Sequence, residues 1–415
     1  MKKINNKLRT IYLVLLSGLF FLTSCNKDLE QFAALPTPTY PTGLGVAATI
    51  AANPNDSLFS RLIVRSGQAA TLNDLTKTFT IFAVDNAGMK VFVNAASGGA
   101  VPLNAPDATF SAFIAGSLPA ASAAGIVMYN TIGQKFPFGN IPTTFPNYPL
   151  TSQIILDPTQ PFVRMNIFPV RGTPYSYVNN IPVTGVDQAA ANGIIHHTFT
   201  IVAPPSATLK TVIAGEATLS YFRAAIARAD SGSVGLGRLD SLLNYGVTNM
   251  TVLTPNDAAM QPILFGALYA GLLAQGVLPA TALAQATALS STPAGFNFLP
   301  VATVKGIMAY HFFATNPTGS YVPNIRVFSV NFPTTPTFIK TLVNGGVPVH
   351  PGILSQAFFT GPVADSVKFT GLGTFPPGGA AYSAPPATSR RSLNMLDKHA
   401  VNGVYHIIDR VLLPQ

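Results

Sequence analysis

The chain has 415 residues and a formal net charge of +9; 48% of the residues are hydrophobic and only 9% are charged, against roughly 25% in an ordinary soluble domain. This composition excludes a charged disordered chain and disfavours a coiled coil, which needs Glu, Lys and Arg beside its apolar seam. A single cysteine excludes an intramolecular disulfide framework and a cysteine zinc site, and the length indicates two or three domains.

The N-terminus has the layout of a bacterial secretory signal. Basic residues precede an apolar run over 11–22, which is shorter than the roughly 20 residues of a membrane-spanning helix. The Leu-Thr-Ser-Cys sequence that ends at Cys25 resembles a bacterial lipobox. The resemblance implies removal of residues 1–24 and lipidation of Cys25 with palmitate or a related acyl chain, so that the membrane is one partner. The alternatives are an uncleaved N-terminal anchor and a chance free thiol.

Charge beyond the signal is modest and scattered. Four positive charges belong to the signal, and the longest basic run after it is Arg390-Arg391, which argues against nucleic acid as a partner. Residues 25–49 are predicted to form a lipidated N-terminus and a semi-extended Pro- and Thr-rich spacer. The charged run that starts at Asn26 resembles the surface-export tag of Bacteroidetes lipoproteins. We therefore expect a lipid-anchored, surface-exposed protein of the outer membrane.

Three segments occur twice in the same order, which indicates an internal duplication. The offset between the copies grows from 171 to 181 to 210 positions, so the second copy carries extra residues, most of them after Tyr310. The matching pairs are 80–89 with 251–260, 126–130 with 307–311, and 187–196 with 397–406.

Each repeated segment has a local structural interpretation. The first is a β-branched strand that runs into a polar turn and a helix. The second is an apolar helix that ends at Tyr129 or Tyr310. The third is an Asn-Gly turn into a strand, and Asn-Gly suits positive φ. We expect Asp187 and Asp397 to anchor that turn by accepting backbone hydrogen bonds.

Together these segments resemble the fasciclin-like domain. The resemblance implies an α+β fold of two tandem fasciclin-like domains, each a wedge-shaped β-sandwich with packed short helices. The first domain would span 50–205 and the second 206–415, with an insertion around 316–390. That insertion and residues 132–182 are predicted to hold strands with long loops, because their β-branched and aromatic content is high.

The resemblance also implies candidate partner-binding residues. In animal members of the family, the Asp-Ile and Tyr-His regions are implicated in integrin binding. The first copy departs from this pattern, since Asn130 stands where the family has His, and Gln or Lys replaces the Ile of the Asp-Ile pair. Packing of Tyr310-His311 between helix and sheet is the alternative role. The matching positions here are Tyr310, His311, Asp397, Lys398 and Asp187.

A long uncharged stretch needs a membrane check. No Asp, Glu, Lys or Arg occurs over residues 258–304, and 264–278 is strongly apolar. Pro262 bounds this apolar run on one side, and Pro279 ends it on the other, so a soluble helix with a buried leucine stripe is favoured over membrane contact.

Catalytic patterns are missing from the sequence. It contains no His-Glu-x-x-His helix, no Gly-x-Ser-x-Gly elbow and no phosphate-binding Gly-rich loop. His196 and His406 each follow an Asn-Gly turn, which favours hydrogen-bonded structural histidines over a ligand-binding role. We expect no catalytic residues, no metal and no cofactor.

The sequence therefore predicts a non-catalytic cell-envelope lipoprotein that mediates adhesion or binds an extracellular protein. The alternative is an accessory lipoprotein that captures a glycan or small ligand with the 316–390 insertion. A hydrolase with an unrecognised site is a third hypothesis.

Overall fold

A computed structural model of the chain describes residues 39–375, 382–383 and 386–414. The predicted signal and Cys25 lie outside the described residues. Contacts divide the chain into Met1–Pro41 and one compact unit, Thr42–Gln415. Within that unit, residues 42–205 are called the first half and 206–415 the second half.

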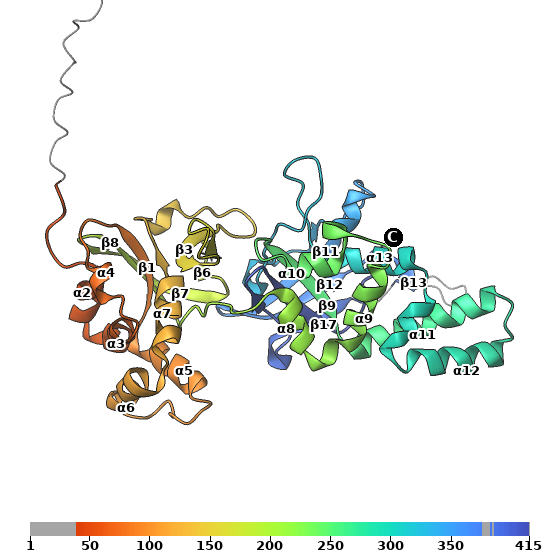
Figure 1. Ribbon diagram of the computed structural model, residues 1–415, viewed down its shortest axis with the longest axis horizontal. Coiled ribbons are helices and arrows are strands. Elements are labelled where there is room, and N and C mark those ends of the chain that lie inside the picture. The colour runs from red at the N-terminus through yellow and green to blue at the C-terminus, as the bar shows by residue number, and fades with distance from the viewer. Residues whose placement is uncertain (1–38, 376–381, 384–385, 415) are drawn as a thin grey trace, which may run out of the picture. The chain divides into compact units, whose positions relative to one another are not determined.

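The first half places short helices beside one continuous eight-stranded sheet, in the order β4-β3-β2-β1-β8-β7-β6-β5 (Figure 1). Its helices are α2 (Val46–Ala52), α3 (Ser57–Arg65), α4 (Ala69–Leu72), α5 (Asn86–Ala96), α6 (Asp107–Ala112) and α7 (Ala120–Tyr129), with short helical turns at Pro54–Asp56, Phe113–Ser117 and Phe138–Asn140. Its strands are β1 (Phe79–Val84), β2 (Thr131–Ile132), β3 (Leu150–Ile155), β4 (Arg164–Ile167), β5 (Pro169–Val170), β6 (Tyr177–Val178), β7 (Ile181–Ala190) and β8 (Gly193–Thr198).

The second half repeats this plan with more elements. Its sheets have the orders β16-β17-β9, β10-β11-β12-β15 and β13-β14. Its helices are α8 (Leu209–Gly215), α9 (Ser220–Ala229), α10 (Leu239–Asn244), α11 (Asp257–Ala274), α12 (Pro279–Ser290) and α13 (Val301–Tyr310). Its short helical turns are Ala217–Leu219, Gly235–Gly237, Pro293–Phe298, Ser329–Asn331, Leu342–Gly345 and Arg391–Leu393. Its strands are β9 (Met250–Pro255), β10 (Thr337–Ile339), β11 (Ile353–Thr360), β12 (Val363–Thr370), β13 (Thr374–Phe375), β14 (Tyr382–Ser383), β15 (Ala387–Arg390), β16 (Lys398–Ala400) and β17 (Gly403–Ile408).

A central strand in each half contributes side chains to two hydrophobic cores, because successive side chains of a strand point to opposite faces. In β1, Ile81 packs with the helices, whereas Phe82 packs with Tyr129 and the strands on the other face. In β9, Val252 and Leu253 divide in the same way. This arrangement of helices on one face and strands on the other confirms the predicted α+β class.

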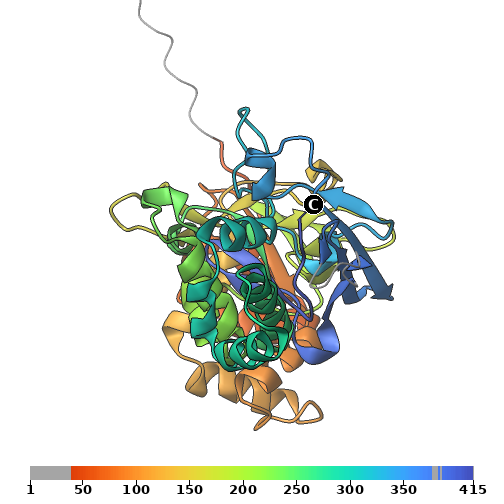
Figure 2. The ribbon, with the colours of Figure 1, turned by 90° about the vertical axis from the view of Figure 1, so that its right-hand side faces the viewer.

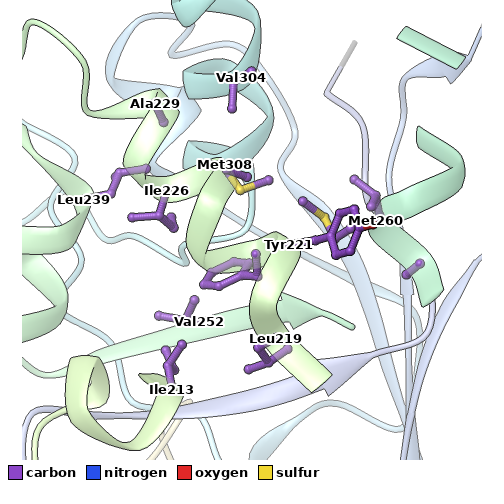
Figure 3. Packing of buried hydrophobic residues seen from close by; sticks show 14 of the residues in the cluster. Ile213, Leu219, Tyr221, Ile226, Ala229, Leu239, Val252, Met260, Val304 and Met308 are labelled. Atoms are coloured by element: carbon purple, nitrogen blue, oxygen red, sulfur yellow. The ribbon is translucent and has the colours of Figure 1, made fainter. Parts of the chain in front are cut away.

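The helix-side core of the second half is assembled from segments far apart in the sequence. Figure 3 shows Ile226 and Met308 from two helices meeting Val252 from β9. Viewed from the end, the green and teal helices of this half lie on one side and blue strands on the other (Figure 2). Apolar side chains contact one another throughout this interior. Their removal from water is the dominant source of stability for such a domain.

The closing strands occupy equivalent places in the two halves. Strand β8 pairs in parallel with β1, with Phe79 opposite Gly193, and β17 pairs in parallel with β9, with Met250 opposite Gly403. These registers reproduce the offsets of 171 and 210 positions between the sequence copies. The duplication read from the sequence is therefore also a duplication of strand pairing.

The role predicted for the Asn-Gly glycines is wrong in its mechanism. Neither Gly193 nor Gly403 has a positive φ; among the described non-glycine residues that do are Asp187 and Asp397, at 59° and 56°. Instead, a Cβ on Gly193 would stand 2.3 Å from the Phe79 carbonyl oxygen. The glycine is required because the neighbouring strand approaches too closely for any side chain.

The asparagine of each Asn-Gly pair holds the first helix of its half. The Asn192 side-chain oxygen accepts from the Val46 N–H at 2.8 Å, and Asn402 accepts from the Leu209 N–H at 2.8 Å. Each amide group also donates to two carbonyl oxygens, those of Leu72 and Asp74 or those of Leu243 and Tyr245. One buried amide thus joins a helix start, a loop and the closing strand.

The predicted spacer 25–49 ends earlier than expected. Helix α2 begins at Val46, which is fully buried, and the Leu44 carbonyl accepts from the Ala191 N–H. The β-branched and aromatic segments 132–182 and 316–390 do form strands with long loops over their described residues, as predicted.

Helix α11 is the part of the uncharged stretch that meets the length and hydropathy of a membrane span, and 22% of its 18-residue window is buried. Its first turns join the second-half core through Met260, Leu264 and Leu268. Its last turns pair with α12 and extend beyond that core (Figure 1). The predicted leucine stripe is present, but it ends before the helix does.

Candidate functional site

The candidate partner-binding residue Asp397 belongs to a buried polar unit with His406. The His406 ring is fully buried, its Nδ1 accepts from the Asp397 N–H at 3.2 Å, and its Nε2 donates to the Val327 carbonyl at 2.9 Å. Burial lowers the pKa of His406. Because Nδ1 accepts a hydrogen bond and therefore carries no proton, the ring is neutral in this arrangement.

The first half contains the same unit. The Asp187 N–H donates to His196 Nδ1 at 3.1 Å, and His196 Nε2 donates to the Phe136 carbonyl at 3.1 Å. Burial also lowers the pKa of His196. The interpretation of both histidines as hydrogen-bonded structural residues is confirmed.

The two aspartate carboxylates accept backbone hydrogen bonds, as predicted, but from another part of the chain. Asp187 accepts from the Phe138 N–H at 2.9 Å, and Asp397 accepts from the Ser329 N–H at 2.6 Å. Asp397 also accepts from Asn180 of the first half at 3.1 Å. Each carboxylate therefore joins its segment to a short helical turn of the same half that is distant in sequence. Neither carboxylate closes the Asn-Gly turn.

Tyr310 and His311 lie inside the second half. The Tyr310 hydroxyl donates to the Gly352 carbonyl at 2.7 Å, His311 Nδ1 donates to the Ile307 carbonyl at 2.8 Å, and its Nε2 accepts from the Leu412 N–H at 3.1 Å. Burial raises the pKa of Tyr310 to about 12 and lowers that of His311 to about 4. The pair locks helix α13 onto the strands, and its role in partner contact stays a prediction.

Lys398 is partly exposed beside an acid. Its Nζ lies 3.9 Å from Glu216 Oε2, and 22% of its side chain is exposed. The Asp187 side chain is 44% exposed. The structure therefore does not bring the five candidate residues to one surface, since Asp187 belongs to the other half and the Tyr-His pair is interior.

An exposed apolar surface lies where helix α11 is followed by α12. Leu273, Leu278 and Leu283 at the α11–α12 turn are 36%, 73% and 51% exposed. We call these three residues the hairpin tip. The equivalent helix α5 has 11 residues where α11 has 18, so the tip stands on added helical turns that carry no charge.

The insertion around 316–390 forms a cavity of about 460 Å³. Its wall is mainly aromatic and aliphatic, with Tyr321 and Phe338 from the insertion and Phe145 from the first half. Asn316 and Lys340 add polar groups to the wall. An apolar hollow with a few polar groups is the usual form of a small-ligand site. The sequence pointed to the segment but not to these residues, because only folding brings Phe145 to them.

Comparisons with known proteins give limited information. No protein-family model matches the chain, and no curated protein matches it. Among solved structures, it is similar to a FAS1 domain pair from the insect cell adhesion molecule fasciclin I, with 13% identity over 87% of this chain and 98% of that chain and a TM-score of 0.30. A TM-score this low carries no argument, so the fasciclin resemblance rests on the repeated motifs.

Proposed function

We propose that this chain is a lipid-anchored lipoprotein of the outer membrane, with two tandem fasciclin-like domains, that mediates adhesion by binding an extracellular protein. The tandem arrangement is supported by the paired registers β1–β8 and β9–β17 and by the matched buried units around His196 and His406. Those matched histidines are engaged by backbone groups, which supports a structural and non-catalytic use of them.

The observation that carries partner binding is the hairpin tip. A soluble surface normally scatters its exposed apolar residues singly, whereas contiguous ones mark contact sites. Leu273, Leu278 and Leu283 are all exposed where α11 is followed by α12, and no charged residue lies between them in the sequence. The complementary partner is a protein with an apolar groove that accepts the tip.

Adhesion of cells that carry the full chain tests this assignment. Replacing the three tip leucines by Gln removes apolar contact area, and we expect at least a tenfold loss of attachment, since each buried leucine contributes about 1 kcal/mol or more. The matched control is Val234→Gln with Val349→Gln, because these side chains are 84% and 88% exposed elsewhere. Attachment that is unchanged in the tip variant, or equally reduced in the control, would refute the assignment.

The anchor has its own test. Cys25→Ser removes the only thiol that can be acylated. We expect the variant to leave the membrane fraction, because the chain would then keep no acyl group. Continued membrane residence of the Ser variant in carbonate-washed fractions would contradict lipidation at Cys25.

The insertion cavity favours a second candidate function, capture of a glycan or small ligand. Tyr321 and Phe338 supply faces on which a sugar ring can pack, in a chain that has no Trp. A glycan array with the purified protein and its Phe338→Ala variant distinguishes the two functions. Glycan binding that the variant loses, while cell attachment persists, would favour capture over adhesion.

A further inference from the structure

The described residues place no opposite charge beside one buried arginine of the second half. Arg326 is only 3% exposed, and its guanidinium donates to His399 Nε2 at 2.9 Å and to the Ala400 and Val401 carbonyls at 3.3 and 2.9 Å. Its planar face lies 4.5 Å from the ring of Phe168, a first-half residue. All of these partners are neutral, because His399 accepts and the others are carbonyls or a ring.

This arrangement is unusual in its electrostatics. Within residues 39–375, 382–383 and 386–414, no carboxylate lies within ion-pair distance of Arg326, and its Nε has no hydrogen-bond partner. Buried charges are normally paired, because removing an ion from water is expensive. The described part of the chain thus leaves one positive charge and one donor without compensation.

Arg326 lines a cavity of about 240 Å³ that a second arginine also lines. Arg164 donates through Nε to the Pro161 carbonyl and through one terminal nitrogen to Gln153. Asn166 and Asn249 also line the cavity, and none of the described residues that line it is acidic. The buried Asn249 side-chain oxygen also has no hydrogen-bond partner among the described residues.

The nearest acidic residue in sequence does not neutralise the cavity. Asp157 follows the lining residue Leu156, but its carboxylate accepts from the Thr159 N–H and hydroxyl at 2.9 and 2.7 Å. Phe162, which is 77% exposed, gives the cavity an aromatic rim. Two cations, amide groups and an exposed ring match an acidic sugar, whose carboxylate takes the charge and whose apolar face covers the ring.

We propose that the cavity between Arg326 and Arg164 binds the carboxylate of a monosaccharide-sized acidic sugar, a uronate. The volume of about 240 Å³ lies at the small end of ligand sites, which fits one sugar unit. The uncompensated Nε–H of Arg326 donates one hydrogen bond to the carboxylate, and the charges of both guanidinium groups attract it. This site is separate from the hairpin tip and from the insertion cavity, so it does not depend on the proposed adhesive function.

Calorimetric titration of the detergent-solubilised protein with glucuronate tests the proposal, with glucose as the uncharged ligand of matched shape. We expect glucuronate to bind and glucose to give no measurable heat. Arg164→Gln removes one charge at the cavity wall, and we expect it to weaken glucuronate binding by about tenfold or more. Arg391→Gln, at an exposed site elsewhere in the second half, leaves binding unchanged.

Arg326→Met provides a second variant, since it removes the buried charge and keeps an unbranched, flexible side chain. We expect loss of glucuronate binding and loss of the thermal stabilisation that glucuronate gives to the unmodified protein. Should this variant fail to fold, the Arg164→Gln titration decides by itself. Equal binding of glucose and glucuronate, no binding of glucuronate, or an Arg164→Gln variant with unchanged affinity would each overturn the proposal.

Discussion

The two halves share a strand register but differ at one buried pair. In the first half, Asp56 is fully buried and its Oδ2 lies 3.1 Å from His197 Nε2. In the second half, the residues just before the α9 start and just after His406 are Leu219 and Ile407, which are both buried in the helix-side core. Equivalent backbone positions in the two halves therefore accommodate either polar or apolar side chains.

The difference shows which of the two pairs the fold needs. Asp56 Oδ1 has no hydrogen-bond partner among the described residues, so the polar pair satisfies itself incompletely. A buried ion pair is commonly no more stabilising than well-packed aliphatic residues of similar volume. The aliphatic pair of the second half is sufficient for the fold, and the Asp-His pair is a feature of the first half alone. It lines a polar cavity of about 420 Å³ together with Asp85.

A second difference lies at the end of the mid-domain helix. His311 uses both ring nitrogens, whereas Asn130 at the equivalent place donates to the Ile126 and Val202 carbonyls and leaves its side-chain oxygen unpaired within the described structure. The first half thus holds this position with a group that does not titrate. The second half has a titratable imidazole at the same position.

The largest expected effect tests whether the halves close in the same way. Gly193→Ala and Gly403→Ala place a Cβ 2.3 Å and 2.5 Å from the carbonyl oxygens of Phe79 and Met250. We expect each variant to lower the free energy of unfolding by about 4 kcal/mol, because a backbone oxygen cannot yield as a side chain does. Urea unfolding measures the loss, and a mild effect at one position only would break the equivalence of the closing strands.

Transplanting the buried pair tests the first comparison. His197→Ile alone removes the imidazole partner of Asp56 and leaves it with the side-chain amide of Asn53, and we expect a loss of about 3 kcal/mol. Adding Asp56→Leu reproduces the side chains of the second half. We expect the urea midpoint of the double variant to be at least as high as that of the unmodified chain. A double variant that is no more stable than His197→Ile would show that the first half requires its Asp-His pair.

Acid stability tests the second comparison. The pKa of His311 is lowered by burial to about 4 from 6.5, so this group stabilises the fold above pH 6.5, and the contribution is lost as the pH falls toward 4. We expect protonation of this group to lower the free energy of unfolding by about 2 kcal/mol between pH 7 and pH 5. His311→Asn, which copies the first half, flattens that slope in urea titrations at several pH values. An unchanged slope would assign the acid sensitivity to the other buried histidines.

The smallest effect concerns two glycines inside equivalent helices. Gly125 in α7 and Gly306 in α13 have no atom within 4 Å of the place where a Cβ would stand. Substitution by Ala reduces the freedom of the unfolded chain, so we expect a gain of about 0.7 kcal/mol at each. Thermal unfolding of the two single variants measures it, and a loss at either site would reveal a difference between the halves that their backbones do not show.

Much of the fold was predictable because its information is local. The strand before Asp85, the helix that ends at Tyr310 and the strand after Asn402 follow from side-chain periodicity and turn chemistry. Their repetition in order predicted two equivalent registers, which β1–β8 and β9–β17 show. The α+β class required only these segments and the aromatic, β-branched runs between them.

The candidate sites were predictable only in part, because they depend on residues that no local pattern connects. The sequence identified Asp397 and Tyr310-His311 but could not show that the pair is interior or that Asn180 reaches Asp397. It predicted a soluble helix with a buried leucine stripe in 264–278, but it did not show that Leu273 and Leu278 are exposed. Helical spacing predicts which face is apolar, whereas the length of core available to cover that face is a property of the other elements.

The sequence by itself determined the duplication, the secondary structure of the repeated segments and the chemistry of each turn, since all of these follow from neighbouring residues. Only the tertiary structure decided that Gly193 is needed for close strand approach, that the hairpin tip is exposed, and that Arg326 lies buried with no carboxylate of the described residues within ion-pair distance. The physical reason is that contact, burial and charge compensation are set by residues on other elements, often more than a hundred positions away.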